Sequence, residues 1–84
     1  MHMRVLYFAS LRDAAGRDAE DVEIASASLA QLYDEASARH GFLLPLDRLR
    51  VARNGTFAQW NEIALEGDEI AFIPPVSGGE AHGF

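Results

Sequence analysis

The chain has 84 residues, a formal net charge of −6 from 13 acidic and 7 basic side chains, and no cysteine. A chain of this length forms one domain with one core. Its acidity disfavours nucleic-acid and anionic membrane partners, because both carry negative charge. The lack of cysteine excludes disulfides, thiol nucleophiles and a persulfide held on the chain itself. The first residues do not have the pattern of a signal peptide, so we expect a cytoplasmic location.

The first part of the sequence predicts two strands and a short helical segment. Residues 3–9 are apolar on both alternating faces, which is typical of a central strand. Residues 10–15 predict one or two helical turns, with Ser10 as the N-cap and Gly16 as the left-handed end. Residues 19–25 alternate acidic and apolar side chains and predict a half-buried strand.

One amphipathic helix follows, and capping signals bound it at both ends. Ser28 and Gln31 have the spacing of a capping box, and Gly41 ends the helical pattern. A stripe of side chains has the i, i+3, i+4, i+7, i+11 spacing of a helix that packs on a sheet. Its members are Leu29, Leu32, Tyr33, Ala36 and His40. The apolar residues 42–46 then predict a connector that covers the end of the core.

The second half of the sequence predicts a hairpin and a last strand. Residues 49–53 and 56–58 flank Asn54-Gly55, a dipeptide typical of a tight hairpin turn. Residues 69–73 are the last strand. Pro74-Pro75 ends it, because proline cannot donate a hydrogen bond to a sheet ladder.

This order of elements predicts an α+β domain with the β-grasp (ubiquitin-like) architecture, a mixed sheet with one main helix packed on one face. The first and last strands are the most apolar, so we expect them to lie side by side and parallel at the centre of the sheet. We expect the domain to span residues 3–76. A C-terminal tail, residues 77–84, would contain Gly78-Gly79 and a further five residues.

The sequence does not predict a self-contained catalytic site or a metal site. Two of the three histidines lie near the ends of the sequence and His40 ends the main helix, so a metal-ligand cluster is not expected. The serines lack the context of an activated nucleophile. The acidic pairs Asp34-Glu35 and Asp68-Glu69 are interpreted as solvated charge. We therefore expect neither an independent catalytic activity nor a bound cofactor.

The segment after the last strand combines a stiff stem with a slender tip. Pro74 and Pro75 have fixed φ angles, and Gly78 and Gly79 have no side chains that could block a narrow channel. Such a segment suits insertion into another protein's active site, where a carboxylate on Gly79 could be adenylated and attacked by sulfur. An inert tail has the same composition, and these residues alone leave that alternative open.

Three stretches of the sequence resemble the MoaD family, the ubiquitin-like sulfur carriers that are the small subunits of molybdopterin synthase. They are residues 4–12, residues 51–54 and residues 67–79, which include Phe72-Ile73-Pro74-Pro75-Val76 and Gly78-Gly79. The double proline favours this branch over a thiamine-type sulfur carrier, which shares the fold.

The resemblance implies that Gly79 is the acyl carrier and that Gly78 keeps the channel clear. An E1-like adenylyltransferase would use ATP to activate Gly79, and a sulfurtransferase donor would convert it to a thiocarboxylate. The large synthase subunit, in a heterotetramer, would pass that sulfur to cyclic pyranopterin monophosphate. The alternatives are a thiamine-type or other sulfur carrier and a non-catalytic β-grasp interaction module with an inert tail.

The resemblance also implies a set of residues that bind the partner subunit. They are Phe8, Phe57, Ile73, Pro74, Pro75 and Val76. Phe8, Phe57 and Ile73 would form an apolar patch. Ordinary core packing is the alternative for these three side chains, and for Phe57 the two interpretations have equal weight.

The sequence departs from the family's pattern after Gly79. Members of the family end at the second glycine, whereas five residues follow it here. A glycine in an amide bond has no free carboxylate, so Gly79 cannot be adenylated in this form. We expect a protease to remove residues 80–84 before activation. The alternatives are an extension introduced by cloning and a paralogue that has lost sulfur transfer.

Overall fold

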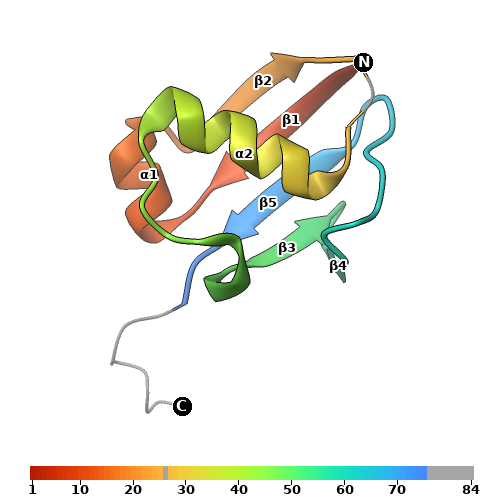
Figure 1. Cartoon of the computed structure of the whole chain (residues 1–84). Coiled ribbons are helices and arrows are strands. Elements are labelled where there is room, and N and C mark those ends of the chain that lie inside the picture. The colour runs from red at the N-terminus through yellow and green to blue at the C-terminus, as the bar shows by residue number, and fades with distance from the viewer. Residues whose placement is uncertain (26, 76–84) are drawn as a thin grey trace.

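Five strands form one mixed sheet in the order β2-β1-β5-β3-β4 (Figure 1). The computed structural model describes residues 1–25 and 27–75. Parallel pairing joins β1 and β5, and the other three neighbouring pairs are antiparallel. The strands are β1 (His2–Tyr7), β2 (Ala19–Glu23), β3 (Arg50–Arg53), β4 (Thr56–Ala58) and β5 (Glu69–Ile73). The predicted parallel pairing of the first and last strands is therefore confirmed.

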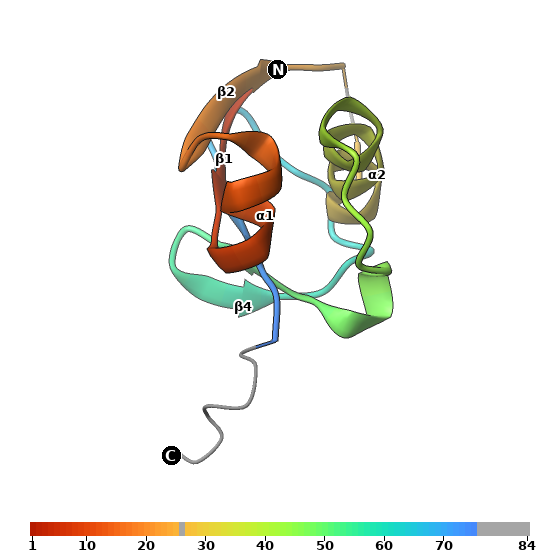
Figure 2. The ribbon, with the colours of Figure 1, turned by 90° about the vertical axis from the view of Figure 1, so that its left-hand side faces the viewer.

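The helix α2 (Leu29–His40) lies across one face of the sheet (Figure 2). Its predicted capping box is confirmed, because Oγ of Ser28 accepts a 3.2 Å hydrogen bond from the N–H of Gln31 and Oε1 of Gln31 accepts one of 2.8 Å from the N–H of Ser28. Gly41 ends the helix in the left-handed conformation, with φ of 73°. The predicted stripe faces the sheet, and its fully buried members are Leu29, Leu32, Tyr33 and Ala36.

The short helix α1 (Ala9–Ala15) corrects one detail of the sequence prediction. Ser10 lies inside this helix, and Phe8 is the N-cap, without a side-chain hydrogen bond. The reason is that the carbonyl of Phe8 accepts hydrogen bonds from the N–H groups of Leu11 and Arg12, so the first turn begins before Ser10. Gly16 ends α1 with φ of 76°, as predicted.

The hydrophobic core fills the space between α2 and the sheet. In β1 the side chains of Met3, Val5 and Tyr7 face this core and are almost completely buried, and Ile70 and Phe72 of β5 lie beside them. The strand period of two explains the alternation. After α2, the connector includes the 3-10 helix η1 (Leu46–Arg48).

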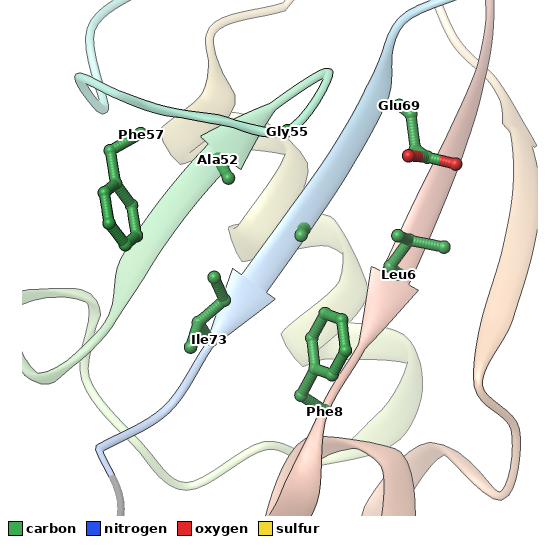
Figure 3. A pocket seen from close by; sticks show the side chains of 8 residues that line it. Leu6, Phe8, Ala52, Gly55, Phe57, Glu69 and Ile73 are labelled. Carbon is green, nitrogen blue, oxygen red and sulfur yellow. The ribbon is translucent and has the colours of Figure 1, made fainter. Parts of the chain in front are cut away.

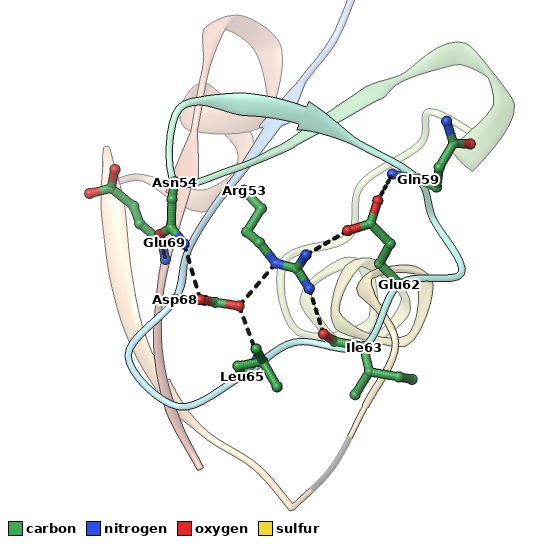
Figure 4. Close-up of polar contacts among 8 residues, drawn as sticks. All are labelled: Arg53, Asn54, Gln59, Glu62, Ile63, Leu65, Asp68 and Glu69. Carbon is green, nitrogen blue, oxygen red and sulfur yellow. Dashed lines mark hydrogen bonds and ion pairs between the residues drawn. The ribbon is translucent and has the colours of Figure 1, made fainter.

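A buried carboxylate, Asp68, fixes the turn before β5 (Figure 4). It accepts hydrogen bonds from Nε of Arg53 at 3.1 Å, from Nδ2 of Asn54 at 3.1 Å and from the N–H of Leu65 at 2.9 Å. Burial favours the protonated carboxyl, but these donors outweigh it and hold the pKa of Asp68 below its usual range. The prediction of Asp68 as solvated charge is therefore wrong.

Within the described ranges, no helix combines the length and the apolar character that crossing a membrane requires. Val76 and the predicted tail, residues 77–84, lie outside the described residues. The domain boundary at residue 76 therefore stays a prediction.

Candidate functional site

The face of the sheet opposite α2 carries an apolar hollow (Figure 3). The side chains that face away from the core on four neighbouring strands line it, because side chains alternate between the two faces of a sheet. We define the open-face patch as Leu6, Phe8, Ala52, Phe57, Ala71 and Ile73. Gly55 and Glu69 complete the rim of the hollow.

Two alanines make the floor of the open-face patch. Ala71 of β5 lies opposite Ala52 of β3 in the strand register and also opposite Leu6 of β1. Because alanine side chains are short, the larger side chains on either side stand above them. Figure 3 shows Leu6 and Phe8 on one side and Phe57 on the other. The result is a depression that fits an apolar side chain of another molecule.

The exposure of Phe8 and Phe57 excludes the alternative that these two residues are ordinary core. The side chain of Phe57 is 62% exposed and that of Phe8 is 43% exposed, so neither is a core residue. Ile73 is half-buried beside them. Contiguous exposed apolar side chains are a feature of surfaces that another protein covers. The structure thus places Phe8, Phe57 and Ile73 around one hollow, while their role in partner binding stays a prediction.

The proline stem begins at the border of the open-face patch. A second hollow, lined by Phe8, Ala9, Ile73 and Pro74, continues the patch to the point where the chain leaves β5. Pro74 is buried there, whereas Pro75 is exposed. The predicted site residues Val76, Gly78 and Gly79 lie outside the described residues.

Arg50 is a polar neighbour of the patch that the sequence analysis missed. Its Cζ lies 4.6 Å from the centroid of the Phe57 ring. The strand register also places Arg50 opposite Ile73. Its position in the predicted strand before the hairpin turn was the available signal, but the contact with Phe57 depends on the three-dimensional twist of that hairpin.

The described residues of the site offer binding and little chemistry. Among those that line the open-face patch and its rim, Glu69 alone carries a titratable group. A search of residues 1–25 and 27–75 finds no cluster of three metal-ligating side chains. The exposed apolar side chains of the open-face patch are suited to bind an apolar surface of another protein.

The fold and this site define a small β-grasp protein of the ubiquitin-like class, with an open apolar face beside the exit of its last strand. A family model described as the ThiS family matches residues 5–79. The chain therefore belongs to the ThiS family. Its predicted resemblance to the MoaD branch, the molybdopterin synthase sulfur carriers, is confirmed by curated relatives.

One such relative is the molybdopterin synthase sulfur carrier subunit of Escherichia coli K12, which is 34% identical over 80 residues and covers 92% of this chain and 99% of its own length. Among solved structures, SAMP1 of Haloferax volcanii, a small archaeal modifier protein, is 31% identical, has a TM-score of 0.80, and covers 94% of this chain and 100% of its own. A complex of subunits 1 and 2 of the molybdopterin-converting factor of Helicobacter pylori contains a chain with the same fold. That chain is 22% identical, has a TM-score of 0.66, and covers 94% of this chain and 100% of its own.

Proposed function

We propose that this chain is the sulfur carrier subunit of a molybdopterin synthase and that Gly79 carries the sulfur as a thiocarboxylate. The observation that carries the proposal is the adjacency of the open-face patch and the proline stem, in a chain whose curated relatives bear this name. A surface that docks a partner lies beside the segment that leads to Gly79. Docking of the patch would therefore direct that segment into the partner.

The proposed chemistry needs a free carboxylate on Gly79. Hydrolysis of the amide bond after Gly79 releases residues 80–84 and leaves that carboxylate. A carboxylate oxygen then attacks the α-phosphorus of ATP in an E1-like enzyme, which forms an acyl adenylate and releases pyrophosphate. A sulfur nucleophile from a donor protein attacks the acyl carbon and displaces AMP. Where the donor carries this sulfur as a persulfide, the product is an acyl disulfide. Two thiols of a reductant then cleave its S–S bond, which leaves the thiocarboxylate on Gly79 and a thiol on the donor, and the two thiols are oxidised to a disulfide.

The partner in this proposal is the large subunit of the synthase. Its active site would bind cyclic pyranopterin monophosphate and receive the thiocarboxylate of Gly79. The sulfur attacks an electrophilic carbon of the pterin precursor and displaces an oxygen leaving group from it. Water then hydrolyses the resulting thioester, so that the sulfur stays on the precursor and Gly79 returns to a carboxylate. The occurrence of this fold in the Helicobacter pylori complex supports a two-subunit arrangement.

The carrier itself would be a co-substrate and not a catalyst. The side chains that line the open-face patch and its rim are apolar except for that of Glu69, and they include no serine, threonine, cysteine or lysine that could act as a nucleophile. The activating enzyme, the sulfur donor and the processing protease are therefore separate proteins. We infer a cytoplasmic location for all of them.

The similarity to the small archaeal modifier protein supports a second candidate function, a protein modifier. Both functions begin with the adenylate of Gly79. They differ in the nucleophile that displaces AMP, which is sulfur for the carrier and an amine of another protein for the modifier. The mass of the product therefore distinguishes them.

The test uses the full chain, the chain that ends at Gly79, and two variants of the shorter chain. Each is incubated with the E1-like enzyme from the same genome, ATP and sulfide, and its intact mass is measured. We expect the shorter chain to gain the mass difference between sulfur and oxygen and the full chain to stay unchanged. Loaded carrier should then produce molybdopterin with the large subunit and the pterin precursor.

Gly79→Val should block loading, because its β-branched side chain crowds the acyl carbon, whereas the matched Ser77→Val control should be loaded. A shorter chain that never gains the sulfur mass contradicts the carrier proposal. A covalent conjugate with another protein, formed in place of the thiocarboxylate, favours the modifier.

A further inference from the structure

We propose that Arg50 is a specificity-determining residue of the open-face patch and that the partner brings an Asp or Glu side chain to it. The inference rests on the proposed function, because the partner is the large subunit of the synthase. It deepens that function by adding one charged contact to a surface that is otherwise apolar.

The Arg50 guanidinium lies at the border of the open-face patch. Arg50 is exposed and lies opposite Ile73 in the register of β3 and β5. Its Cζ lies 4.6 Å from the centroid of the Phe57 ring, within the range of a cation–π contact. A partner that covers Phe57 and Ile73 therefore also covers or borders Arg50.

Within the described residues, Arg50 has no carboxylate partner. Ion pairs engage Arg4, Arg12, Arg39 and Arg53, whereas Arg17, Arg48 and Arg50 have none within the described residues, and of these three only Arg50 borders the open-face patch. In residues 1–25 and 27–75, no ion pair engages Arg50, although acidic side chains outnumber basic ones in this sequence. The acidic group on the rim of the patch, Glu69, lies on β5 opposite Arg4, whereas Arg50 lies opposite Ile73 at the other end of that strand.

The N–H donors of the Arg50 guanidinium are suited to bind a carboxylate. The Cζ atom of Arg50 lies over the Phe57 ring, which offers no oxygen acceptor, and a planar guanidinium carries its N–H groups around its edge. These edge donors match the two oxygens of a carboxylate, which can accept two parallel hydrogen bonds. Stacking on Phe57 also restricts the rotamers of Arg50, so less entropy is lost when a carboxylate binds.

A depression beside Arg50 offers space for the acidic side chain of the partner. Arg50 and Phe57 both line a further depression, which is separate from the hollow at Pro74 and shares Phe57 with the open-face patch. Its other lining residues are Leu49, Val51, Ala58, Gln59 and Trp60. An apolar side chain in the patch and an acidic side chain in this depression would then lie on the two sides of Phe57.

Desolvation of the Arg50 guanidinium decides whether a partner surface binds well or poorly. A guanidinium that is covered without an acceptor loses its hydration and gains no hydrogen bond in return. A partner surface that lacked a carboxylate would therefore bind this patch poorly. Arg50 selects for an acidic partner surface and against an otherwise similar apolar one.

The experiment measures the affinity of the purified large subunit from the same genome for wild-type chain and variants by isothermal titration calorimetry. Arg50→Met keeps an unbranched, largely apolar side chain and removes the charge, and Arg50→Glu reverses it. Arg17→Met and Arg17→Glu are matched controls, because Arg17 is exposed in the α1–β2 loop and does not line the patch. Titrations at about 50 mM and about 500 mM NaCl measure the salt dependence, which screening of an ion pair should reveal.

We expect Arg50→Met to weaken binding at least about tenfold and Arg50→Glu about 100-fold, with a smaller salt dependence for Arg50→Met. The Arg17 variants should bind within about threefold of wild type, as exposed charges outside an interface do. One exchange of an acidic residue for Arg in the large subunit should restore the binding of Arg50→Glu.

The two possible failures give different results. If wild type binds and Arg50→Met binds equally well at both salt concentrations, the proposed role of Arg50 is wrong and the carrier function stands. If wild-type chain does not bind the large subunit at all, the proposed function is wrong and the role of Arg50 falls with it.

Discussion

The hydroxyl of Tyr7 donates a 2.7 Å hydrogen bond to Oε1 of Glu20, across the paired strands β1 and β2. The same oxygen lies 3.1 Å from Nη2 of Arg39 and 3.0 Å from Nε2 of His40, at the end of α2. One carboxylate oxygen thus joins the edge of the sheet to the helix that covers it. His40 ends α2 as predicted, and Glu20 is its partner.

This cluster predicts a pH-dependent loss of stability when Glu20 is replaced. Burial favours the protonated carboxyl, but hydrogen bonds from His40, Tyr7 and Arg39 outweigh burial and lower the pKa of Glu20 to about 2. A lowered pKa means that the ionised carboxylate stabilises the fold above the unfolded pKa of about 4.3. That contribution is lost as the pH falls towards 2.

We therefore expect Glu20→Gln to lower the free energy of unfolding by about 1–3 kcal/mol at neutral pH, the usual range for hydrogen bonds to a charged group. Urea unfolding at pH 7 and near pH 2.5 measures it, and the difference from wild type should shrink at the lower pH. The control Glu35→Gln, on the exposed side of α2, should change stability by no more than about 0.5 kcal/mol. An equal loss at both pH values would contradict the role of the ionised carboxylate.

The tyrosines provide a second, spectroscopic prediction at alkaline pH. Burial and the hydrogen bond to Glu20 raise the pKa of Tyr7 to about 12, and burial and the charge of Asp34 raise the pKa of Tyr33. The chain contains only these two tyrosines. Since a raised pKa favours the neutral form, it stabilises the fold below pH about 10, and this contribution is lost as the pH rises through the folded pKa.

Absorbance of phenolate near 295 nm should therefore stay low at pH about 10 in the folded chain and reach half its final value in urea at that pH. Far-UV circular dichroism in the same samples reports whether the chain is folded. Half-ionised tyrosine at pH about 10 in a chain with native circular dichroism would contradict the burial of both hydroxyl groups.

The sequence predicts those parts of this fold that are determined by local patterns. The capping box of Ser28 and Gln31 and the turn at Asn54-Gly55 each involve residues close in sequence, and both form as expected. Asn54 has φ of 52° and Gly55 has φ of 87°, the left-handed conformations that this dipeptide tolerates. The central position of β1 and β5, where they pair in parallel, follows from their apolar composition, because a central strand is buried on both faces.

The features that the sequence analysis missed depend on contacts between distant elements. The buried carboxylate of Asp68 pairs with Arg53 of β3, which lies fifteen residues earlier in the sequence. The β3–β5 register brings these two residues together. The resemblance predicts Phe8, Phe57 and Ile73 as one patch, and only the sheet topology shows which face they share. Arg50 was missed because its stacking on Phe57 is set by the geometry of the hairpin.

The buried carboxylate of Asp68 gives a third prediction. Asp68→Asn keeps the size of the side chain but removes the charge that faces Arg53, and one amide oxygen cannot serve the donors that two carboxylate oxygens serve (Figure 4). We expect a loss of about 2 kcal/mol in the free energy of unfolding.

Urea unfolding at pH 7 measures this loss, and faster hydrogen exchange of the Leu65 amide should accompany it, because that amide donates to Asp68. Asp34→Asn, on the exposed side of α2, is the control with the same chemical change. If both variants are equally stable, Asp68 does not hold the turn.

The last prediction separates binding from folding within the aromatic residues of the sheet. Phe57 is 62% exposed, whereas Phe72 is fully buried in the core. Phe72→Ala should lower the free energy of unfolding by about 3–5 kcal/mol, as removal of a buried aromatic side chain does. Phe57→Ala should lower it by less than about 1 kcal/mol, because little buried area is lost.

Binding to the large subunit should depend strongly on Phe57, although the stability of the fold depends on it little. We expect Phe57→Ala to weaken it at least about tenfold, because an aromatic side chain at the centre of an interface commonly contributes that much. Leu43→Ala is the control, since Leu43 is 97% exposed but lies in the connector after α2, away from the open-face patch. Combining Phe57→Ala with Arg50→Met should weaken binding by less than the product of the single effects, because Phe57 positions the guanidinium of Arg50. Equal weakening by Leu43→Ala and Phe57→Ala would show that binding does not use the patch.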